Sequence, residues 1–411
     1  MKDRFRKVSQ VLGWVLVVGM FFMMQGSTVF AATDEVKIGA SISLSGKLTR
    51  EGNGLKEGYE FWADYMNGKG GIEVGGKKYK IKMIFYDDES NPQRAAKLTE
   101  KLITEDKINL ILGPYSSGIA IATSAISERY RYVTILPLAN SDKIYVTGYK
   151  YVFSILPVAS RDMVPMMDLC LQQSPKPTKL AAIAANSVYP IMVAEGIRDY
   201  AKSLGVALVY FEKFPDDTSD LSSMLAVIKS KNPDLLFEAG YYEHSILINR
   251  QLKDLGWAPK GLAYSVGPQL PEFAETLKKD ADGAMAVAYW HRALQYKDPV
   301  LGSAQEYAEM MKKKFGKYPI HVHADGTAAG LLLQRALKDA GSLDQEKIRS
   351  ALLKIEVKDS IVGPIKFDRN GRNIWGSTAV IQIQGGDQKV VYPEKAANAK
   401  FLYPVVPWSQ R

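Results

Sequence analysis

Cysteine and histidine are scarce in this chain of 411 residues. Cys170 is its single cysteine, so the chain cannot form an internal disulfide or a metal site built from several thiolates. Only four histidines are present, and the pair His321 and His323 has no third candidate ligand beside it. We therefore expect no metal site. Cys170 falls in an apolar helical segment, where a buried and unreactive thiol is expected.

The motifs of nucleotide binding and nucleophilic catalysis are also missing. A phosphate-binding loop fails at Gly39 to Leu48, because six residues separate the two glycines and leucine follows Lys47. No Rossmann glycine fingerprint follows the first strand. The segment Gly113 to Gly118 resembles a nucleophile elbow with one residue too many between its glycines. We expect neither catalytic residues nor a cofactor, and a secreted enzyme is the least favoured of the functions considered.

Most of the chain carries only a small excess of positive charge. The formal net charge is +9, but residues 1–7 supply +3 and leave +6 on the remainder. The other basic residues are scattered among acidic ones, and the longest basic run is Lys312 to Lys314. This pattern predicts a solvated, mildly basic surface and argues against nucleic acid as a partner.

The one long apolar run lies at the N-terminus. Basic residues 1–7 precede an apolar run of 14 residues, 11–24, and small residues end the segment at Ala31 and Ala32. This order is that of a secretory signal peptide over residues 1–31, with cleavage after Ala31. The run is shorter than the ~20 residues of a membrane-spanning helix, and no cysteine follows it as a lipid anchor. We expect a periplasmic or otherwise extracytoplasmic protein that is soluble after cleavage.

Beyond Ala32, β-rich runs alternate with helical patterns, which predicts parallel α/β architecture. Several expected strands are continuous apolar runs, as is typical of parallel strands covered on both faces. The expected strands are 36–44, 80–87, 109–113, 133–136, 179–185, 206–213, 234–238, 261–265 and 283–288. The expected helices between them are 54–67, 92–105, 118–130, 162–173, 190–204, 219–230, 243–255 and 270–279.

The rhythm of this alternation changes twice. An irregular polar segment precedes residue 150, and after residue 290 three helical patterns, 299–315, 323–340 and 344–354, follow without a strand between them. The last part, 361–391, is again β-like. We infer two α/β lobes joined by more than one crossing of the chain.

One loop is suited to a small polar ligand. Gly113 to Gly118 follows a buried strand and precedes a helix, so Ser116, Ser117 and the free amides of the helix N-terminus could hold a carboxylate. Capping of the helix by one of the serines explains the same residues equally well.

Together these segments resemble the leucine/isoleucine/valine-binding family of periplasmic solute-binding proteins, which serve ABC importers. The resemblance spans Val36 to Gly376, and its pieces occur in the family's order and spacing. They are Ser43-Leu44-Ser45-Gly46 with Gly52, Asn67 with Gly70-Gly71-Ile72, Tyr86-Asp87-Asp88 with Asn91-Pro92, and Gly113-Pro114-Tyr115-Ser116-Ser117.

The resemblance implies a type I periplasmic-binding-protein fold. Its two doubly wound, parallel-sheet lobes are joined by three crossings and close on a ligand in the cleft between them. On this basis the N-terminal lobe is expected to comprise residues 32–156 and 286–362, and the C-terminal lobe 157–285 and 363–411. The resemblance also leads us to expect a monomer.

The family's ligand contacts on the first lobe fall on two loops of this sequence. Ser117 matches the carboxylate-binding position, with Tyr115 and Ser116 lining the same loop. On the next loop, Leu138 would offer its backbone carbonyl and Asn140 its side chain.

On the second lobe, Tyr189 and Tyr241 match frequent cleft aromatics, although ordinary packing between the lobes is an alternative for Tyr241. This sequence departs from the family at two positions. Val266 stands where amino-acid binders place an acid against the ligand ammonium, and Glu51, beside Arg50, stands where a tyrosine is common. Either Glu51 or another carboxylate takes over the ammonium, or the ligand has none.

The resemblance implies an extracytoplasmic binding protein that delivers a branched-chain-type amino acid or related small carboxylate to an ABC permease. The alternative is a sensor or regulator that binds an aromatic or aliphatic carboxylate or an amide.

Overall fold

The computed structural model describes residues 34–411. The expected signal peptide, residues 1–31, lies outside the described residues. Within 34–411, no helix is both long enough and apolar enough to cross a membrane.

The first lobe is built on a six-stranded sheet with the strand order β2-β3-β1-β4-β5-β6. Every pairing is parallel except the β2–β3 hairpin. The strands are β1 (Glu35–Ile42), β2 (Ile72–Val74), β3 (Lys77–Asp87), β4 (Leu110–Leu112), β5 (Thr134–Leu136) and β6 (Val152–Ser154). Strands β4, β5 and β6 are mostly apolar and fully buried, as is typical of strands covered on both faces, although β6 is the last strand at one edge of the sheet.

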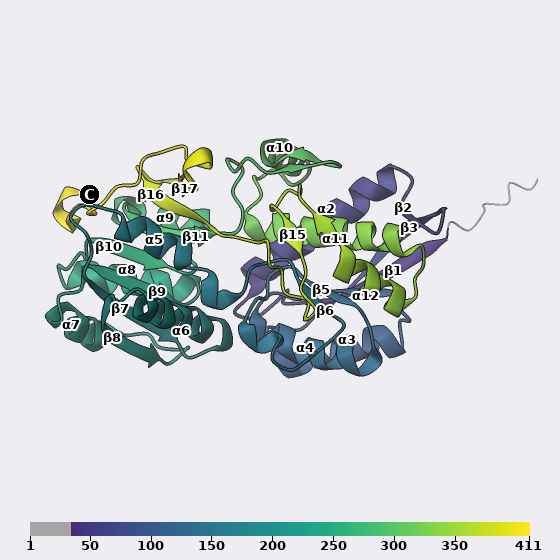
Figure 1. Ribbon diagram of the computed structural model, residues 1–411, viewed down its shortest axis with the longest axis horizontal. Helices are drawn as coiled ribbons and strands as arrows, with labels where there is room; N and C mark the ends of the chain where they lie inside the picture. Colours follow the sequence, from purple (N-terminus) through teal and green to yellow (C-terminus); the bar gives the residue numbers. More distant parts are fainter. Residues whose placement is uncertain (1–33) are drawn as a thin grey trace, which may run out of the picture. The chain divides into compact units, whose positions relative to one another are not determined.

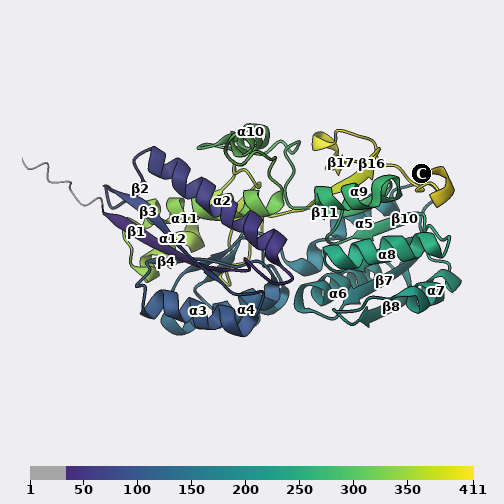
Figure 2. The same ribbon diagram turned by 180° about the vertical axis from the view of Figure 1, so that it is seen from behind.

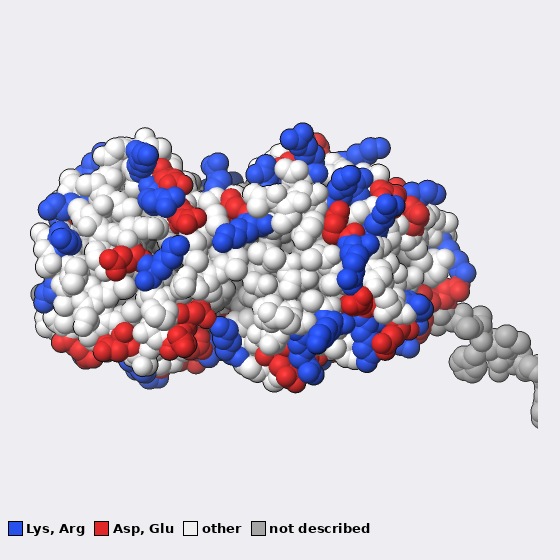
Figure 3. Space-filling view, turned by 90° about the horizontal axis from the view of Figure 1, so that it is seen from below, with Lys and Arg blue, Asp and Glu red and all other residues white. Residues whose placement is uncertain are grey.

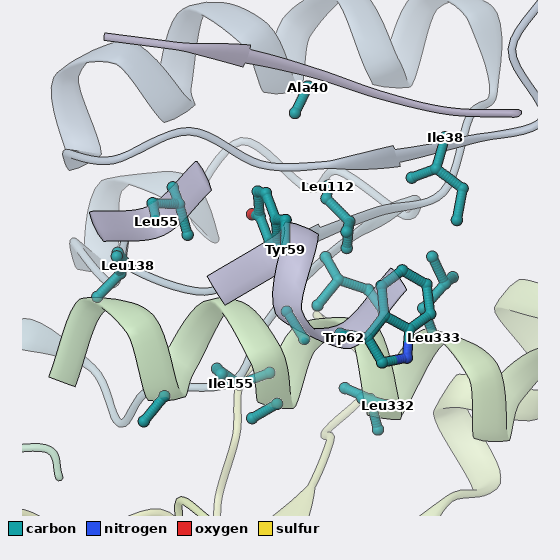
Figure 4. Packing of buried hydrophobic residues seen from close by; sticks show 14 of the residues in the cluster. Ile38, Ala40, Leu55, Tyr59, Trp62, Leu112, Leu138, Ile155, Leu332 and Leu333 are labelled. Atoms are coloured by element: carbon teal, nitrogen blue, oxygen red, sulfur yellow. The ribbon is translucent and has the colours of Figure 1, made fainter. Parts of the chain in front are cut away.

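Helices cover both faces of this sheet, with α2 and α11 on one face and α3 and α4 on the other (Figures 1 and 2). Their bounds are α2 (Thr49–Gly68), α3 (Pro92–Thr104), α4 (Ser117–Tyr130), α10 (Ala304–Phe315), α11 (His321–Ala340) and α12 (Gln345–Lys354). Figure 4 shows the core on the first of these faces, where Tyr59 and Trp62 of α2 and Leu332 of α11 pack with Ile38 of β1.

The second lobe is built on a seven-stranded sheet with the order β17-β16-β11-β10-β9-β7-β8. Its strands β7 to β11 are parallel, and β16 and β17 add an antiparallel hairpin at one edge. The strands are β7 (Lys179–Ala185), β8 (Ala207–Phe214), β9 (Leu235–Ala239), β10 (Gly261–Tyr264), β11 (Ala284–Ala288), β16 (Ala379–Gln384) and β17 (Asp387–Tyr392). The helices are α5 (Val164–Leu171), α6 (Val188–Ser203), α7 (Ser222–Ser230), α8 (Tyr242–Asp254) and α9 (Pro271–Leu277).

The expected two-lobe α/β fold is confirmed, but two boundaries between the lobes differ from the expectation. Strand β11 pairs within the second sheet as far as Ala288, so the second crossing follows residue 288 rather than 285. Ile365 and Phe367 belong to the first lobe's core, where the Phe367 ring lies 5.1 Å from the ring of Phe153. The third crossing therefore follows Phe367 rather than residue 362, because the apolar side chains of this segment complete the first core.

Short hairpins and single turns connect these elements. They are β12 (Lys297–Asp298), β13 (Gly302–Ser303), β14 (Glu356–Val357), β15 (Ile365–Lys366), and the 3₁₀ turns η1 (Asp142–Ile144), η2 (Ala159–Arg161), η3 (Lys278–Ala281), η4 (Glu394–Ala396) and η5 (Trp408–Gln410). Helix α10 begins at Ala304, later than the expected residue 299, because the β12–β13 hairpin precedes it and Ser303 caps it.

Cys170 lies on α5 in the second core and is fully buried, as expected. Burial raises the pKa of its thiol to about 12, and its Sγ lies 3.9 Å from Sδ of Met285.

Candidate functional site

A pocket lies between the two lobes, at the carboxyl ends of the strands of both sheets. Open parallel sheets place their ligand sites at this edge. Most of its lining residues follow directly on a strand: Tyr115, Ser116 and Ser117 after β4, Leu138 and Asn140 after β5, Leu156 after β6, Tyr189 after β7, Tyr241 after β9, Val266 and Gln269 after β10, and Tyr289 after β11; His321 begins α11. The enclosed space is about 20 Å³, which is about enough for one water molecule. A larger ligand would enter only if the lobes separate or the lining side chains move.

Ser117 joins the two loops that the first lobe contributes. Its Oγ accepts hydrogen bonds from the backbone amides of Asn140, at 3.3 Å, and Ser141, at 3.1 Å. The side chain is almost wholly buried. Because the oxygen accepts both bonds, the hydroxyl hydrogen is available to donate to a group in the pocket.

Ser116 has a strained backbone. Its φ of 74° and ψ of 142° lie in a region that side-chain-bearing residues rarely adopt. Its Oγ caps α4 weakly, accepting from the amide of Ile119 at 3.5 Å. The loop therefore supplies the capping expected of a serine and also stores strain at the pocket, which is typical of functional sites.

Tyr115 and Leu138 form an isolated parallel β-bridge, so the two first-lobe loops are held together at a second point. Asn140 lines the pocket, but its side-chain amide is directed to the hinge, the region where the chain crosses between the two lobes. Nδ2 donates to the carbonyl of Pro157 at 2.7 Å and to the carboxylate of Asp162 at 3.0 Å. The side-chain amide of Asn140 was expected to contact a ligand, but its NH₂ group already donates these two structural hydrogen bonds.

Asp162 connects all three crossings, and the motifs gave no sign of it. It lies at the first crossing, Tyr289 of the second crossing donates a short hydrogen bond to its carboxylate, and Thr378 of the third donates to its backbone carbonyl at 2.8 Å. Complete burial raises the pKa of Asp162 to about 8, although the hydrogen bonds from Tyr289 and Asn140 act in the opposite direction. The carboxyl is therefore largely protonated at neutral pH.

The second lobe faces the pocket with aromatic rings and neutral groups. The rings of Tyr189 and Tyr241 lie 6.2 Å apart, and the hydroxyl of Tyr189 is 3.3 Å from that of Tyr289. Burial raises the pKa of each of these tyrosines well above its ordinary value. Val266 lines the pocket at the position where the resemblance places an acid in amino-acid binders, and it adds only apolar surface.

Glu51 and Arg50 lie beside the pocket rather than among its lining residues. Glu51, in the first turn of α2, is buried, and this burial raises its pKa to about 7. After burial, its charge is among the causes that raise the pKa values of Tyr115 and Tyr241, so its carboxyl is electrostatically coupled to both tyrosines. A Cβ on the next residue, Gly52, would lie 1.9 Å from the carbonyl oxygen of Ser43, so only glycine lets α2 begin this close to the loop after β1.

Arg50 reaches across to the second lobe. Its guanidinium lies 4.0 Å from the ring centre of Tyr242 and within 3.9 Å of the carboxylates of Glu243 and Glu272. A second contact between the lobes pairs Lys47 with Asp216 at 2.5 Å. The structure thus places Arg50 in contact between the lobes, at the edge of the cleft.

The two histidines considered as metal ligands lie in the first turn of α11 rather than on a strand. His323 Nδ1 accepts from the amide of Ile320, and its Nε2 lies 3.0 Å from Glu57. Within residues 34–411, no group of three or more His, Cys, Asp or Glu side chains is placed to hold a metal ion. On the face seen in Figure 3, basic and acidic side chains are interspersed.

Comparisons with known proteins agree with this geometry. The family profile described as periplasmic binding protein matches residues 35–388. A relative from Brucella abortus, named Leu/Ile/Val-binding protein homolog 8, is 27% identical over 394 residues, which covers 92% of this chain and 95% of that protein.

Two solved structures have the same fold. A branched-chain amino acid transporter substrate-binding protein from Streptococcus pneumoniae, in complex with isoleucine, is 22% identical with a TM-score of 0.77, covering 88% of this chain and 100% of that one. A solute-binding protein of an ABC transporter from Rhodopseudomonas palustris, in complex with 3,4-dihydroxybenzoic acid, is 19% identical with a TM-score of 0.74, covering 92% and 100%. Since the family profile spans most of the chain and the two-lobe fold agrees with it, the resemblance noted in the sequence is confirmed, and the chain belongs to the periplasmic binding protein family.

Proposed function

We propose that this chain is an extracytoplasmic solute-binding protein that captures a branched-chain-type amino acid or a related small carboxylate and delivers it to an ABC permease. The observation that carries the proposal is the Ser116–Ser117 loop at the N-terminus of α4, which lines the pocket between the lobes. The first turn of a helix has amides without intrahelical acceptors and a positive dipole end, both of which favour a carboxylate. The hydroxyl of Ser117 adds a donor at the same place.

Closure of the two lobes would bury the ligand. The tyrosines of the second lobe would then cover its body, while the carboxylate stays on the first-lobe loops. The contacts of Arg50 and of Lys47 with second-lobe residues hold the two lobes together on one side of the cleft. Support for the ligand class comes from relatives named for leucine, isoleucine and valine.

The end of the ligand opposite its carboxylate could be bound in two ways. An amino acid needs a partner for its ammonium, and Glu51 is the acid that could supply it, since its carboxyl is coupled to the pocket residues Tyr115 and Tyr241. A carboxylate without an ammonium would suit the apolar Val266 and the tyrosines, and a structural neighbour crystallised with 3,4-dihydroxybenzoic acid supports this second candidate. An aromatic or aliphatic carboxylate bound in a sensing role is therefore the alternative.

A thermal-shift screen of amino acids, aromatic acids, short dicarboxylates and amides on the chain without residues 1–31 tests the proposal. A ligand present at 100 times its Kd should stabilise the protein by about 2.7 kcal/mol. The best ligand is then titrated calorimetrically into Ser117→Ala, whose affinity should fall by about 1–3 kcal/mol. No stabilising ligand in any class, or an unchanged affinity in Ser117→Ala, contradicts the proposed carboxylate site.

Glu51→Gln separates the two ligand classes. For an α-amino acid the substitution should weaken binding by about 1.5–3 kcal/mol, because the ammonium loses a charged partner. For a simple carboxylate it should be neutral or favourable, because it removes a like charge. Uptake measured with and without the permease distinguishes transport from sensing.

A further inference from the structure

A second, larger cavity adjoins the pocket between the lobes. It has a volume of about 680 Å³ and is lined by the start of α9, the segment after β11, the loop before α11 and the start of β17. Gln269 and His321 line both spaces, so the pocket and the larger cavity meet at these two side chains. If the lobes separate or these side chains move, a ligand held at the Ser117 loop could extend past them into the larger cavity.

Three buried polar atoms among the residues lining this cavity have no hydrogen-bond partner within the described protein. They are Oε1 of Gln269, Nε1 of Trp290 and Nδ1 of His321. Their residues are exposed by only 6%, 4% and 4%. Buried polar atoms almost always have a partner, and leaving one without a partner is costly. All three atoms belong to residues that line one cavity, and a group bound there would complete them once the side chains turn toward it.

These three atoms carry no charge. Burial and the neighbouring His323 lower the pKa of His321 to about 3, so its ring is neutral and offers one donor and one acceptor. Trp290 offers an N–H donor, and the free oxygen of Gln269 is an acceptor, since its Nε2 donates to the carbonyl of Ser265 at 3.3 Å. A group with both a donor and an acceptor matches this set, as an amide or a hydroxyl does.

The basic residues of the cavity have partners that also line it, and two acidic residues, Glu275 and Asp387, line it as well. Arg292 lies 4.1 Å from the ring centre of Tyr318, and Lys389 pairs with Asp387 at 3.1 Å. Burial, with the guanidinium and the ammonium, lowers the pKa of His291 to about 4, so the imidazole at this end of the cavity is neutral.

We propose that this cavity is a distal subsite of the ligand cleft, and that Gln269, Trp290 and His321 bind an uncharged amide or hydroxyl at the far end of the ligand. The inference rests on the proposed function, because the ligand's carboxylate is placed at the Ser117 loop. It narrows the ligand class to carboxylates or amino acids that carry a neutral polar group remote from the carboxylate.

Two variants remove the distal hydrogen bonds and keep the packing. Trp290→Phe retains a ring against Tyr307, whose ring centre lies 5.8 Å from that of Trp290. Gln269→Leu removes the free oxygen at similar volume. Gln305→Leu is the matched control, because Gln305 lines the same cavity but its amide already donates to Glu309 at 2.7 Å. Thermal melts establish that each variant is folded.

Calorimetric titrations then compare ligands of similar size and different polarity. The probes are leucine with asparagine, methionine with glutamine, glutamate as the charged member, and 4-methylbenzoate with 4-hydroxybenzoate. We expect the amide or hydroxyl member to bind more tightly than its apolar partner. Trp290→Phe and Gln269→Leu should each weaken that member about tenfold, a change of about 1.4 kcal/mol, and leave the apolar member within about twofold. Gln305→Leu should change neither.

Tryptophan fluorescence gives a second readout. The polar member should change the emission of the parent protein, and this change should be lost or reduced in Trp290→Phe. Three outcomes overturn the inference: tighter binding of the apolar or charged member, an equal effect of both variants on all members, or no binding by any probe. An equal effect would indicate that an ordered water, rather than the ligand, completes the three atoms.

Different experimental results would contradict the proposed function and the distal subsite. Leucine that binds tightly, depends on Ser117 and is indifferent to Trp290→Phe and Gln269→Leu would leave the proposed function standing and remove the distal subsite. Absence of binding by every probe, in the parent and in Ser117→Ala alike, would remove both.

Discussion

The two lobes line the pocket with different kinds of chemical group. The first lobe contributes short loops held together through backbone amides, with Ser117 accepting two of them and Ser116 held in a strained conformation. The second lobe contributes side chains on separate loops, chiefly the rings of Tyr189 and Tyr241 with Val266 and Gln269. Backbone donors suit a group that every ligand of a family shares, such as a carboxylate. Side chains can change from one sequence to the next, so we expect the second lobe to select the ligand.

The largest expected effect tests the first-lobe side. Ser117→Ala removes the acceptor of two buried amides, so the free energy of unfolding should fall by about 2–4 kcal/mol. Ser124→Ala is the matched control: Ser124 is buried on the same helix α4, but its Oγ has no hydrogen-bond partner among residues 34–411. Urea denaturation should show a change of less than about 1 kcal/mol for that control. Equal losses in the two variants would mean that the bonds of Ser117 do not hold the loops together.

The acid on the first-lobe side gives the next largest effect. Burial raises the pKa of Glu51 from 4.5 to about 7, so the folded state holds its proton between these values while the unfolded state releases it. The resulting stabilisation is complete below pH 4.5 and is lost as the pH rises through 7. Glu51→Gln should remove about 2–3 kcal/mol of this pH dependence. Denaturation at pH 5 and pH 8 measures it, and an unchanged slope in the variant would contradict the burial of Glu51. Asp162→Asn, measured in parallel, separates the contribution of the hinge carboxyl, whose pKa is also raised.

A smaller effect tests the second-lobe side. Tyr189→Phe removes the hydroxyl contact with Tyr289, so the free energy of unfolding should fall by about 0.5–1.5 kcal/mol. Tyr264→Phe is the control, since its buried hydroxyl donates to Asn249 at 3.2 Å away from the pocket. Both variants should lose similar stability, but only Tyr189→Phe should lose ligand affinity in a calorimetric titration. If Tyr264→Phe weakens binding as much, the tyrosines act through the stability of the lobe and not as a binding surface.

Relief of strain gives an effect of opposite sign. Ser116→Gly should raise the free energy of unfolding by about 0.5–1 kcal/mol, because glycine adopts a positive φ freely and the lost capping bond is weak. Ligand affinity should fall at the same time, since the loop becomes less well ordered. Thermal melts and titrations on one preparation measure both. A variant that is less stable than the parent would show that the serine conformation is not strained.

The smallest effect concerns the contact between the two sides. Lys47 is largely exposed, so its ion pair with Asp216 should contribute less than about 0.5 kcal/mol. Lys47→Ala should therefore change ligand affinity slightly at low salt and not at all at 1 M salt, where such pairs are screened. An effect that persists at high salt would assign Lys47 a direct role in binding.

Much of the fold could be predicted because its signals are local. Short, largely apolar runs such as 109–112 and 179–184 favour buried strands, and the expected and observed helices differ by a few residues at their ends. The Ser116–Ser117 loop was visible for the same reason, since strand, glycine, serines and helix follow one another within a few residues. The boundaries between the lobes were less certain, because the side chains that decide them, such as Phe367, find partners far away in the sequence.

The hinge could not be predicted, because its bonds join distant segments. Tyr289 and Thr378 reach Asp162 across 127 and 216 residues, and no spacing rule connects aspartate, tyrosine and threonine at such separations. The direction of the Asn140 side chain could not be predicted for the same reason. Its position beside the ligand loop was expected, but the direction of its amide depends on Pro157 and Asp162, which meet it only in the folded chain.

The burial of Cys170 has a practical consequence for measuring lobe movement. Thiol-reactive dyes need an accessible thiolate, and this thiol is buried with a raised pKa. Cysteines introduced at the exposed Val146 of the first lobe and Val227 of the second would therefore take up a donor and an acceptor dye without removal of the native residue. Energy transfer between the dyes would then report opening and closing of the cleft in solution, with the unmodified parent chain as the labelling blank.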